Sequence, residues 1–93
     1  MTRFGRVDRT QNEIVEGLRQ AHAVVVVLSR VGQGVPDLMV GFRRAWYLIE
    51  CKSKVGRFTQ DEDEFRLMCV VSELPYAVAR TPEEALRAIG AIR

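Results

Sequence analysis

The pattern of apolar and polar positions begins with a helical segment. From Thr10 onward, Ile14 and Leu18 belong to a set of apolar residues at helical spacing, which predicts a helix with one buried face. Thr10 or Asp8 can cap this helix, because a hydroxyl or carboxylate accepts a hydrogen bond from the first free backbone N–H groups. Residues 1–9 are then expected to form a basic N-terminal arm.

Three extended segments follow the first helix. The β-branched run over residues 23–29 is typical of a buried strand, and the glycines and proline of RVGQGVP after it indicate a loop. Residues 37–42 and 45–52 are predicted to form two strands of a hairpin that turns at Arg43 and Arg44. Because two arginines suit a two-residue turn poorly, we expect a slightly longer loop.

The C-terminal half contains two helices and one strand. Thr59 and Glu62 have the spacing of a capping box, and apolar residues at helical spacing follow them at Phe65, Leu67, Met68 and Val71. The segment LPYAVA predicts a short strand, and TPEEALRAIGAI predicts a last helix with Thr81 as its cap and Pro82 at its first position. The predicted order is αβββαβα, in one α/β domain over residues 1–93.

Composition excludes several classes of protein. The chain has 93 residues, 47% of them hydrophobic and 28% charged, as in an ordinary globular domain. The longest apolar run, residues 23–28, is too short to cross a bilayer, and the N-terminus has no apolar signal region, so we expect a cytoplasmic location. Cys51 and Cys69 lack the spacing of a zinc site and are expected to be reduced thiols.

The net charge of +2 is small, so the placement of the basic residues is more informative than their sum. They form groups at the N-terminus, at the hairpin turn and after the second hairpin strand. Such groups can contact phosphates with little reading of base sequence. The candidates are Arg3, Arg6, Arg9, Arg43, Arg44, Lys54 and Arg57.

Two acidic residues are expected to meet across the hairpin. A turn at residues 43–44 places Asp37 opposite Glu50, about 5 Å apart at Cβ, where two like charges destabilise a sheet unless a positive group lies between them. Strand alternation puts Lys52 on the same face as Glu50. Two carboxylates with water and phosphate oxygens as further ligands suit Mg²⁺. The alternative is that Asp37 caps a strand entry and that Glu50 and Lys52 face solvent.

The segment GVPDLMVG followed by WYLIECKS resembles the PD-(D/E)xK nuclease superfamily, and specifically the small stand-alone VRR-NUC domains of phages and bacteria. The resemblance extends from Thr10 to the C-terminus. It implies a restriction-endonuclease-like core, with a mixed sheet flanked by helices, and a DNA endonuclease that depends on Mg²⁺ or Mn²⁺. Asp37 and Glu50 would bind the metal, the backbone carbonyl of Cys51 would add a ligand, and Lys52 would position the attacking water.

The resemblance also implies residues around this set. The first helix of the family supplies another acid, and Glu13 fits that position better than Glu16, because Glu13 lies beside the buried stripe. The family often has a glutamine at the start of the helix after the catalytic strand. Here Gln60 and Glu62 are the candidates for site support, although Glu62 can equally serve only the capping box.

We therefore expect a structure-selective, metal-dependent DNA endonuclease, with branched or four-way-junction DNA among its substrates and a homodimer with two sites as its assembly. Because no segment for reading bases is evident, selectivity would come from DNA shape. The alternative is a catalytically inactive module of the same fold that binds DNA or protein. Trp46 and Tyr47 could stack on bases, but in an apolar strand one or both are expected to be core or dimer contacts, with the core as the default.

Overall fold

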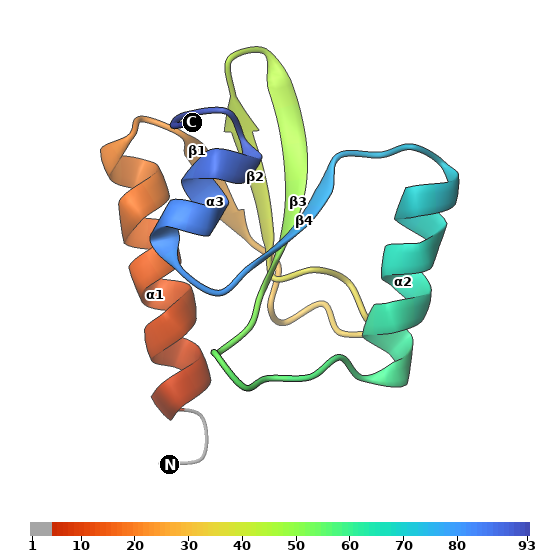
Figure 1. The fold of residues 1–93 in the computed structure, drawn as a ribbon. Coiled ribbons are helices and arrows are strands. Elements are labelled where there is room, and N and C mark those ends of the chain that lie inside the picture. Colours follow the sequence, from red (N-terminus) through yellow and green to blue (C-terminus); the bar gives the residue numbers. More distant parts are fainter. Residues whose placement is uncertain (1–4) are drawn as a thin grey trace.

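The first helix is longer than the sequence predicts. The computed structural model describes residues 5–93, with side chains from residue 9 onward, and α1 spans Gly5–Gln20 (Figure 1). The prediction that this helix begins at Thr10 is wrong, since Thr10 lies inside it. Residues 5–9, which the sequence assigned to a basic N-terminal arm, belong to this helix, whose backbone continues past the candidate caps.

The four strands form one mixed sheet in the order β1-β2-β3-β4. They are β1 Val24–Val27, β2 Leu38–Phe42, β3 Ala45–Cys51 and β4 Tyr76–Ala79. Strand β2 pairs antiparallel with β1 and with β3, and β4 pairs in parallel with β3. The predicted order αβββαβα and the mixed sheet flanked by helices are confirmed, and β3 is an interior strand of the sheet.

The hairpin between β2 and β3 has the predicted register. Phe42 pairs with Ala45 and Leu38 pairs with Ile49, so the turn consists of Arg43 and Arg44 alone. The expectation of a longer loop is wrong. Both arginines adopt positive φ angles, 48° and 75°, which close a two-residue turn at a cost of about 1–2 kcal/mol for each residue with a side chain.

The core lies between the sheet and two helices. Leu38, Val40 and Ile49 face Ile14 and Leu18 of α1, and all five side chains are fully buried. The last helix, α3 Pro82–Ala88, lies beside α1 on the same face of the sheet (Figure 1). It begins as predicted, with the Thr81 side chain accepting a hydrogen bond from the N–H of Glu84 and with Pro82 in the first turn.

Helix α2, Gln60–Val71, lies apart from α1 and α3 across the sheet (Figure 1). The predicted capping box between Thr59 and Glu62 is confirmed. The predicted apolar face is present in the sequence but is not buried, since Leu67 and Val71 are mostly exposed and Cys69 is the buried residue of this helix. Helix α2 therefore keeps most of its apolar side chains outside the core.

The two aromatic residues of β3 have different surroundings. Tyr47 packs against the core, as predicted. Trp46 points to the opposite face of the sheet and is 53% exposed, so its predicted place in the core is wrong. None of the described helices has the length and apolar character needed to cross a bilayer.

Candidate active site

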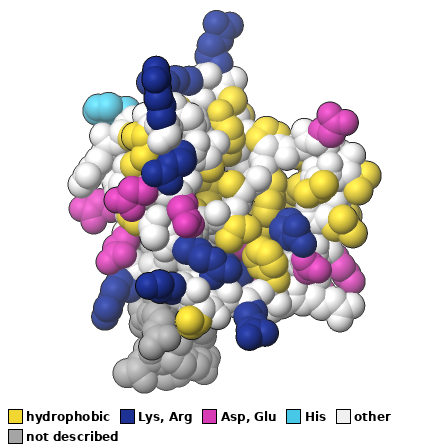
Figure 2. All heavy atoms as spheres, viewed as in Figure 1, with side chains coloured by type: hydrophobic (Ala, Val, Ile, Leu, Met, Phe, Trp, Pro, Cys, Tyr) yellow, Lys and Arg dark blue, Asp and Glu magenta, His cyan; other side chains and the backbone are white. Residues whose placement is uncertain are grey.

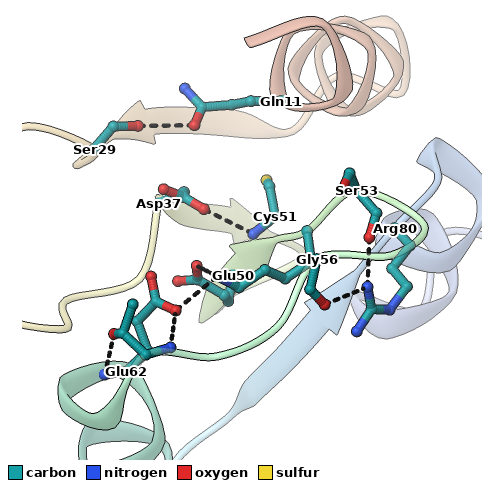
Figure 3. A network of polar contacts seen from close by, with 11 residues as sticks. Gln11, Ser29, Asp37, Glu50, Cys51, Ser53, Gly56, Glu62 and Arg80 are labelled. Carbon is teal, nitrogen blue, oxygen red and sulfur yellow. Dashed lines mark hydrogen bonds and ion pairs between the residues drawn. The ribbon is translucent and has the colours of Figure 1, made fainter. Parts of the chain in front are cut away.

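The antiparallel pairing of β2 and β3 brings the two predicted acids together. Asp37 lies directly before β2, and its Oδ2 accepts a hydrogen bond of 2.9 Å from the backbone N–H of Cys51 at the end of β3 (Figure 3). This bond continues the register in which Leu38 pairs with Ile49. The hairpin thus places the Asp37 carboxylate beside Glu50, as the sequence predicted.

Glu50 is a buried acid. It is only 2% exposed, and burial, with repulsion from Asp37 as the next cause, raises its pKa to about 8. Burial also raises the pKa of Asp37, although the Cys51 N–H opposes this effect. A hydrogen bond between the two carboxyl groups favours the proton on Glu50 and the charge on Asp37. Because the two carboxyl groups do not ionise easily at the same time, a cation bound between them would stabilise their charged forms.

The Lys52 ammonium supplies positive charge beside the two carboxyl groups, and Glu62 holds this ammonium in place. The Lys52 Nζ lies 3.6 Å from Glu50 Oε2 and 2.6 Å from Glu62 Oε1. Burial would raise the pKa of Glu62, but the hydrogen bonds from Lys52 and from the Thr59 N–H lower it overall. The same Oε1 atom accepts both bonds. Glu62 therefore serves the capping box and also contacts Lys52, and its role in site support stays a prediction.

The glycine-rich loop before β2 packs against the start of α2. The φ angle of Gly34 is +80°, and a Cβ at this position would collide with the backbone carbonyl of Asp61. Leu28 at the other end of the loop donates its N–H to the Asp37 carbonyl at 2.6 Å. The loop therefore connects Asp37 and the first turn of α2, which carries Glu62, in one fixed arrangement.

The site opens into two adjoining hollows. One has a volume of about 230 Å³ and is lined by Asp37, Glu50, Lys52, Glu62 and Arg57, among others. The other, of about 480 Å³, lies between the glycine-rich loop and the start of α2, and it shares the Asp37 and Glu62 side chains. Asp37 therefore borders both hollows, and Glu50 lines the smaller one.

The donor set fits a hard divalent cation that keeps several waters. The Asp37 and Glu50 oxygens are the ligand type that Mg²⁺ and Mn²⁺ accept, and buried carboxylates with raised pKa values gain most from a cation. Among the side chains of residues 9–93, no group of three or more histidine, cysteine, aspartate or glutamate residues is placed to hold a metal ion. The thiol of Cys51 faces the core, and burial raises its pKa, which leaves only its backbone as a candidate ligand.

Arg80 is a residue of this region that sequence reasoning missed. It follows β4, and its guanidinium Nη1 donates hydrogen bonds to the carbonyls of Ser53 and Gly56, the latter at 3.1 Å (Figure 3). The Arg80 N–H is bonded in turn to Glu84 Oε1 at 2.7 Å. Arg80 thereby holds the loop directly after Lys52. No local pattern could have indicated contacts over 24 and 27 positions.

The other predicted support residues lie further out. Glu13 is exposed on α1, and its role as a metal ligand stays a prediction. Gln60 is exposed and donates to Glu64 Oε2 at 3.0 Å, although it also lines the larger hollow. Gln11 of α1 reaches the segment just before the glycine-rich loop, where its Oε1 accepts a hydrogen bond of 2.8 Å from the Ser29 hydroxyl (Figure 3).

The predicted basic contacts fall into separate groups. Lys54 and Arg57 are exposed on the loop after β3, beside the site. Arg43 and Arg44 are exposed at the opposite end of the hairpin, where Arg43 lies over the Phe42 ring and donates to the Gly90 carbonyl at 3.3 Å. Arg9 is exposed on α1. The structure describes only the backbone of Arg6, and Arg3 lies outside the described residues.

The structure is thus an α/β fold with a buried acid, Glu50, a half-buried acid, Asp37, and a lysine, Lys52, at the strand ends. A solved structure described as a "VRR_NUC domain" has the same fold, with a TM-score of 0.75 over 95% of this chain and 98% of that chain, at 19% sequence identity. The predicted likeness to VRR-NUC domains is therefore confirmed at the level of the fold. The sequence itself matches no protein-family model and no curated protein at a significant level.

Proposed function

We propose that this protein is a metal-dependent, structure-selective DNA endonuclease of the VRR-NUC type. The observation that carries the proposal is the buried Glu50 beside the half-buried Asp37, with Lys52 at 3.6 Å from Glu50, at the strand ends of a VRR_NUC-like fold. Replacing buried ionisable groups with apolar residues is often neutral or stabilising. Such a pair is therefore more than a pure binding module needs.

Each residue of the set has a distinct proposed role. Asp37, Glu50 and the Cys51 carbonyl would hold Mg²⁺ or Mn²⁺, and Glu13 is the candidate for a further acidic ligand. The bound ion would neutralise charge on the scissile phosphate and activate water. Lys52 would orient the attacking water by hydrogen bonding, and Glu62, through its 2.6 Å contact, would keep the Lys52 ammonium aimed at the carboxylate pair.

The proposed substrate is DNA whose shape is distinctive, such as a four-way junction or another branch. Arg57 lines the hollow at the carboxylate pair, and Lys54 is exposed on the same loop, so both would contact phosphates of a strand that enters the site. Phosphate contacts of this kind position a nucleic acid without specifying its sequence. A branched substrate has two strands to cut, and a homodimer with two sites suits that task. The proposed location is the cytoplasm.

Cleavage of end-labelled DNA tests the proposal directly. Four-way-junction, flap and linear duplex DNA are incubated with the wild-type protein in Mg²⁺, Mn²⁺ or EDTA. We expect cutting that requires the metal and that falls at least about a thousandfold in Asp37→Ala and Lys52→Ala, because both remove groups at the reacting phosphate. The junction and flap should be cut faster than the duplex.

Asp63→Ala is the matched control, since Asp63 is an acid on the exposed surface of α2 whose partner is Arg66. It should cut at the wild-type rate. Fully active, folded Lys52→Ala would contradict the site assignment. DNA binding without cutting in every metal would instead support the inactive binding module of the same fold.

A further inference from the structure

The Lys52 ammonium is surrounded by groups from three parts of the chain. Glu50 of β3 and Glu62 of α2 lie on two sides of it, and the centre of the Phe58 ring, on the loop between these elements, lies 5.6 Å from its Nζ. A ring face attracts a cation at this distance. The Lys52 side chain therefore reaches from the end of β3 toward α2, alongside the loop that joins them.

A tight turn directly after Lys52 forms a wall along this side chain. The N–H of Gly56 donates to the Ser53 carbonyl at 3.0 Å, which closes a turn over residues 53–56. A Cβ on Gly56 would lie 3.4 Å from Lys52 Cδ, so the backbone of the turn runs beside the lysine methylenes. We call residues 53–56 the lysine turn. A shift of this turn would change the space in which Lys52 lies.

Arg80 holds both ends of the lysine turn. Its Nη1 donates hydrogen bonds to the carbonyls of Ser53 and Gly56. In Figure 3, Arg80 lies on the side of the turn away from Glu50 and Glu62. Because a guanidinium is planar and rigid, two bonds from one of its nitrogens fix both carbonyls relative to the Arg80 side chain.

The backbone that carries Arg80 is fixed to the end of β3. Ala79, the residue before Arg80, is fully buried, and its carbonyl accepts a hydrogen bond of 3.0 Å from the Lys52 N–H. The N–H of Arg80 donates to Glu84 Oε1 at 2.7 Å, in the first turn of α3. Arg80 therefore joins the lysine turn to the sheet and to α3.

The tip of the lysine turn is exposed. Val55 is 71% exposed, and Lys54 also faces solvent. Packing of these side chains therefore does not fix the turn, and the bonds from Arg80 are needed to hold its ends. Figure 2 shows Lys and Arg side chains gathered over the loop after β3 and over the neighbouring part of α1. A contact with a DNA phosphate is thus the alternative role for Arg80.

We propose that Arg80 is a positioning residue for Lys52, which acts through the lysine turn to keep the ammonium beside the carboxyl pair. Arg80 itself does not touch the substrate in this role. A displacement of about 1 Å caused by a change outside the reacting groups can lower a rate by about a hundredfold. The effect on cleavage rests on the proposed nuclease function, whereas the effect on the position of the ammonium exists without DNA or metal.

Single-turnover cleavage by Arg80→Met and Arg80→Lys tests the effect on rate, with the DNA that wild type cuts fastest. Methionine removes the charge and the donors, and lysine keeps the charge but ends one bond short of the Nη1 position. Both variants should lower the rate at saturating DNA by about tenfold to a hundredfold and leave the dissociation constant for DNA within about twofold.

Arg87→Met is the matched control. Arg87 is an exposed arginine of α3 that also donates to a backbone carbonyl, that of Arg93 at 3.1 Å. This variant should cut at the wild-type rate. Circular dichroism verifies that each variant is folded, and Arg80→Lys alone serves in both measurements if Arg80→Met does not fold.

A phosphate contact would give a different pattern. Arg80→Met would then weaken DNA binding and lower the slope of log affinity against log salt by about 1, whereas Arg80→Lys would bind and cut almost as wild type does. That pattern would overturn the proposal. A wild-type rate in folded Arg80→Met, or in folded Arg80→Lys, would also overturn it.

Nuclear magnetic resonance of the Lys52 ammonium tests the position itself, in protein without DNA or metal. The signal is assigned by its loss in Lys52→Ala, and the 2.6 Å contact with Glu62 should slow its exchange with water in wild type. The signal should shift or broaden in Arg80→Met and Arg80→Lys and should stay unchanged in Arg87→Met.

The two measurements separate this proposal from the nuclease proposal. An unchanged Lys52 signal in the folded Arg80 variants would overturn the positioning role, even if wild type cuts DNA. A changed signal together with no cutting by wild type in any metal would support the positioning role and count against the nuclease function alone.

Discussion

At the scale of single residues, the central feature is an acid held out of water. Glu50 is buried beside Asp37, and its pKa of about 8 means that ionising it costs free energy in the metal-free protein. Lys52 is the nearby cation, but it is shared with Glu62, which holds it at the shorter distance. The buried Glu50 and its neighbour Asp37, which form the candidate metal site, therefore also lower the free energy of unfolding of the metal-free protein.

Glu50→Gln should change how the stability of the metal-free protein depends on pH. A folded-state pKa raised above the usual 4.5 means that the folded protein keeps a proton that the unfolded chain releases. The stability of the metal-free wild type should therefore fall as pH rises from about 4.5 to about 8, by on the order of a few kcal/mol. Glu50→Gln should lack this fall, because its amide does not ionise.

Thermal unfolding in EDTA at pH 5 and pH 8, at one protein concentration, measures this effect. The variant should unfold at a higher temperature than wild type at pH 8 and should not cleave DNA. Glu73→Gln, a change to an exposed acid in the turn after α2, should follow wild type at both pH values. Equal pH dependence of Glu50→Gln and wild type would show that Glu50 is not the source.

At the scale of elements, the β2–β3 hairpin shows how a strained turn can persist. Arg43 and Arg44 both have positive φ angles, where asparagine and glycine are favoured. The register of the flanking strands nevertheless leaves two residues for the turn. Two exposed arginines at a position that disfavours them are consistent with the proposed role in contacting phosphates.

Replacing the turn by Arg43→Asn with Arg44→Gly should separate strain from charge. We expect the free energy of unfolding to rise by about 1–2 kcal/mol, because the new residues adopt positive φ more easily. DNA affinity should fall, and the slope of log affinity against log salt should decrease by up to about 2, one unit for each lost phosphate contact. Denaturant unfolding and binding titrations at several salt concentrations measure both effects.

The control for this pair of changes is Arg43→Lys with Arg44→Lys, which keeps the charge and the backbone strain at positive φ. It should leave both stability and the salt slope near their wild-type values. A salt slope that is unchanged by the Asn-Gly turn would remove Arg43 and Arg44 from the DNA-binding surface.

At the scale of the whole molecule, the proposed metal site is linked to global stability. A cation that binds only the folded protein stabilises it by about 2.7 kcal/mol at a concentration 100 times its dissociation constant. Because the metal must displace the proton of Glu50, this stabilisation should be smaller at pH 6.5 than at pH 8.5.

Thermal unfolding with and without Mg²⁺ at these two pH values measures the linkage. Asp37→Ala should lose the Mg²⁺-dependent rise in unfolding temperature, whereas Asp63→Ala should retain it. A rise of equal size in Asp37→Ala would place the ion elsewhere in the protein. Constant protein concentration is required, because dimerisation also shifts the unfolding temperature.

The sequence by itself determined the local features of this protein. The element order, the hairpin register that aligns Asp37 with Glu50, and the caps at Thr59 and Thr81 follow from patterns within a few residues. Periodicity and capping chemistry act over such short distances, so they can be read without a structure. The likeness to VRR-NUC domains depended on the same short motifs.

Only the tertiary structure decided which apolar faces are covered and which distant residues meet. The spacing of Leu67 and Val71 predicts an apolar helix face but not whether anything packs on it, and Trp46 in an apolar strand gives no sign of its exposure. The contacts of Arg80 with Ser53 and of Lys52 with Glu62 join separate elements. Burial and long-range contacts depend on how elements pack in three dimensions, which local patterns do not encode.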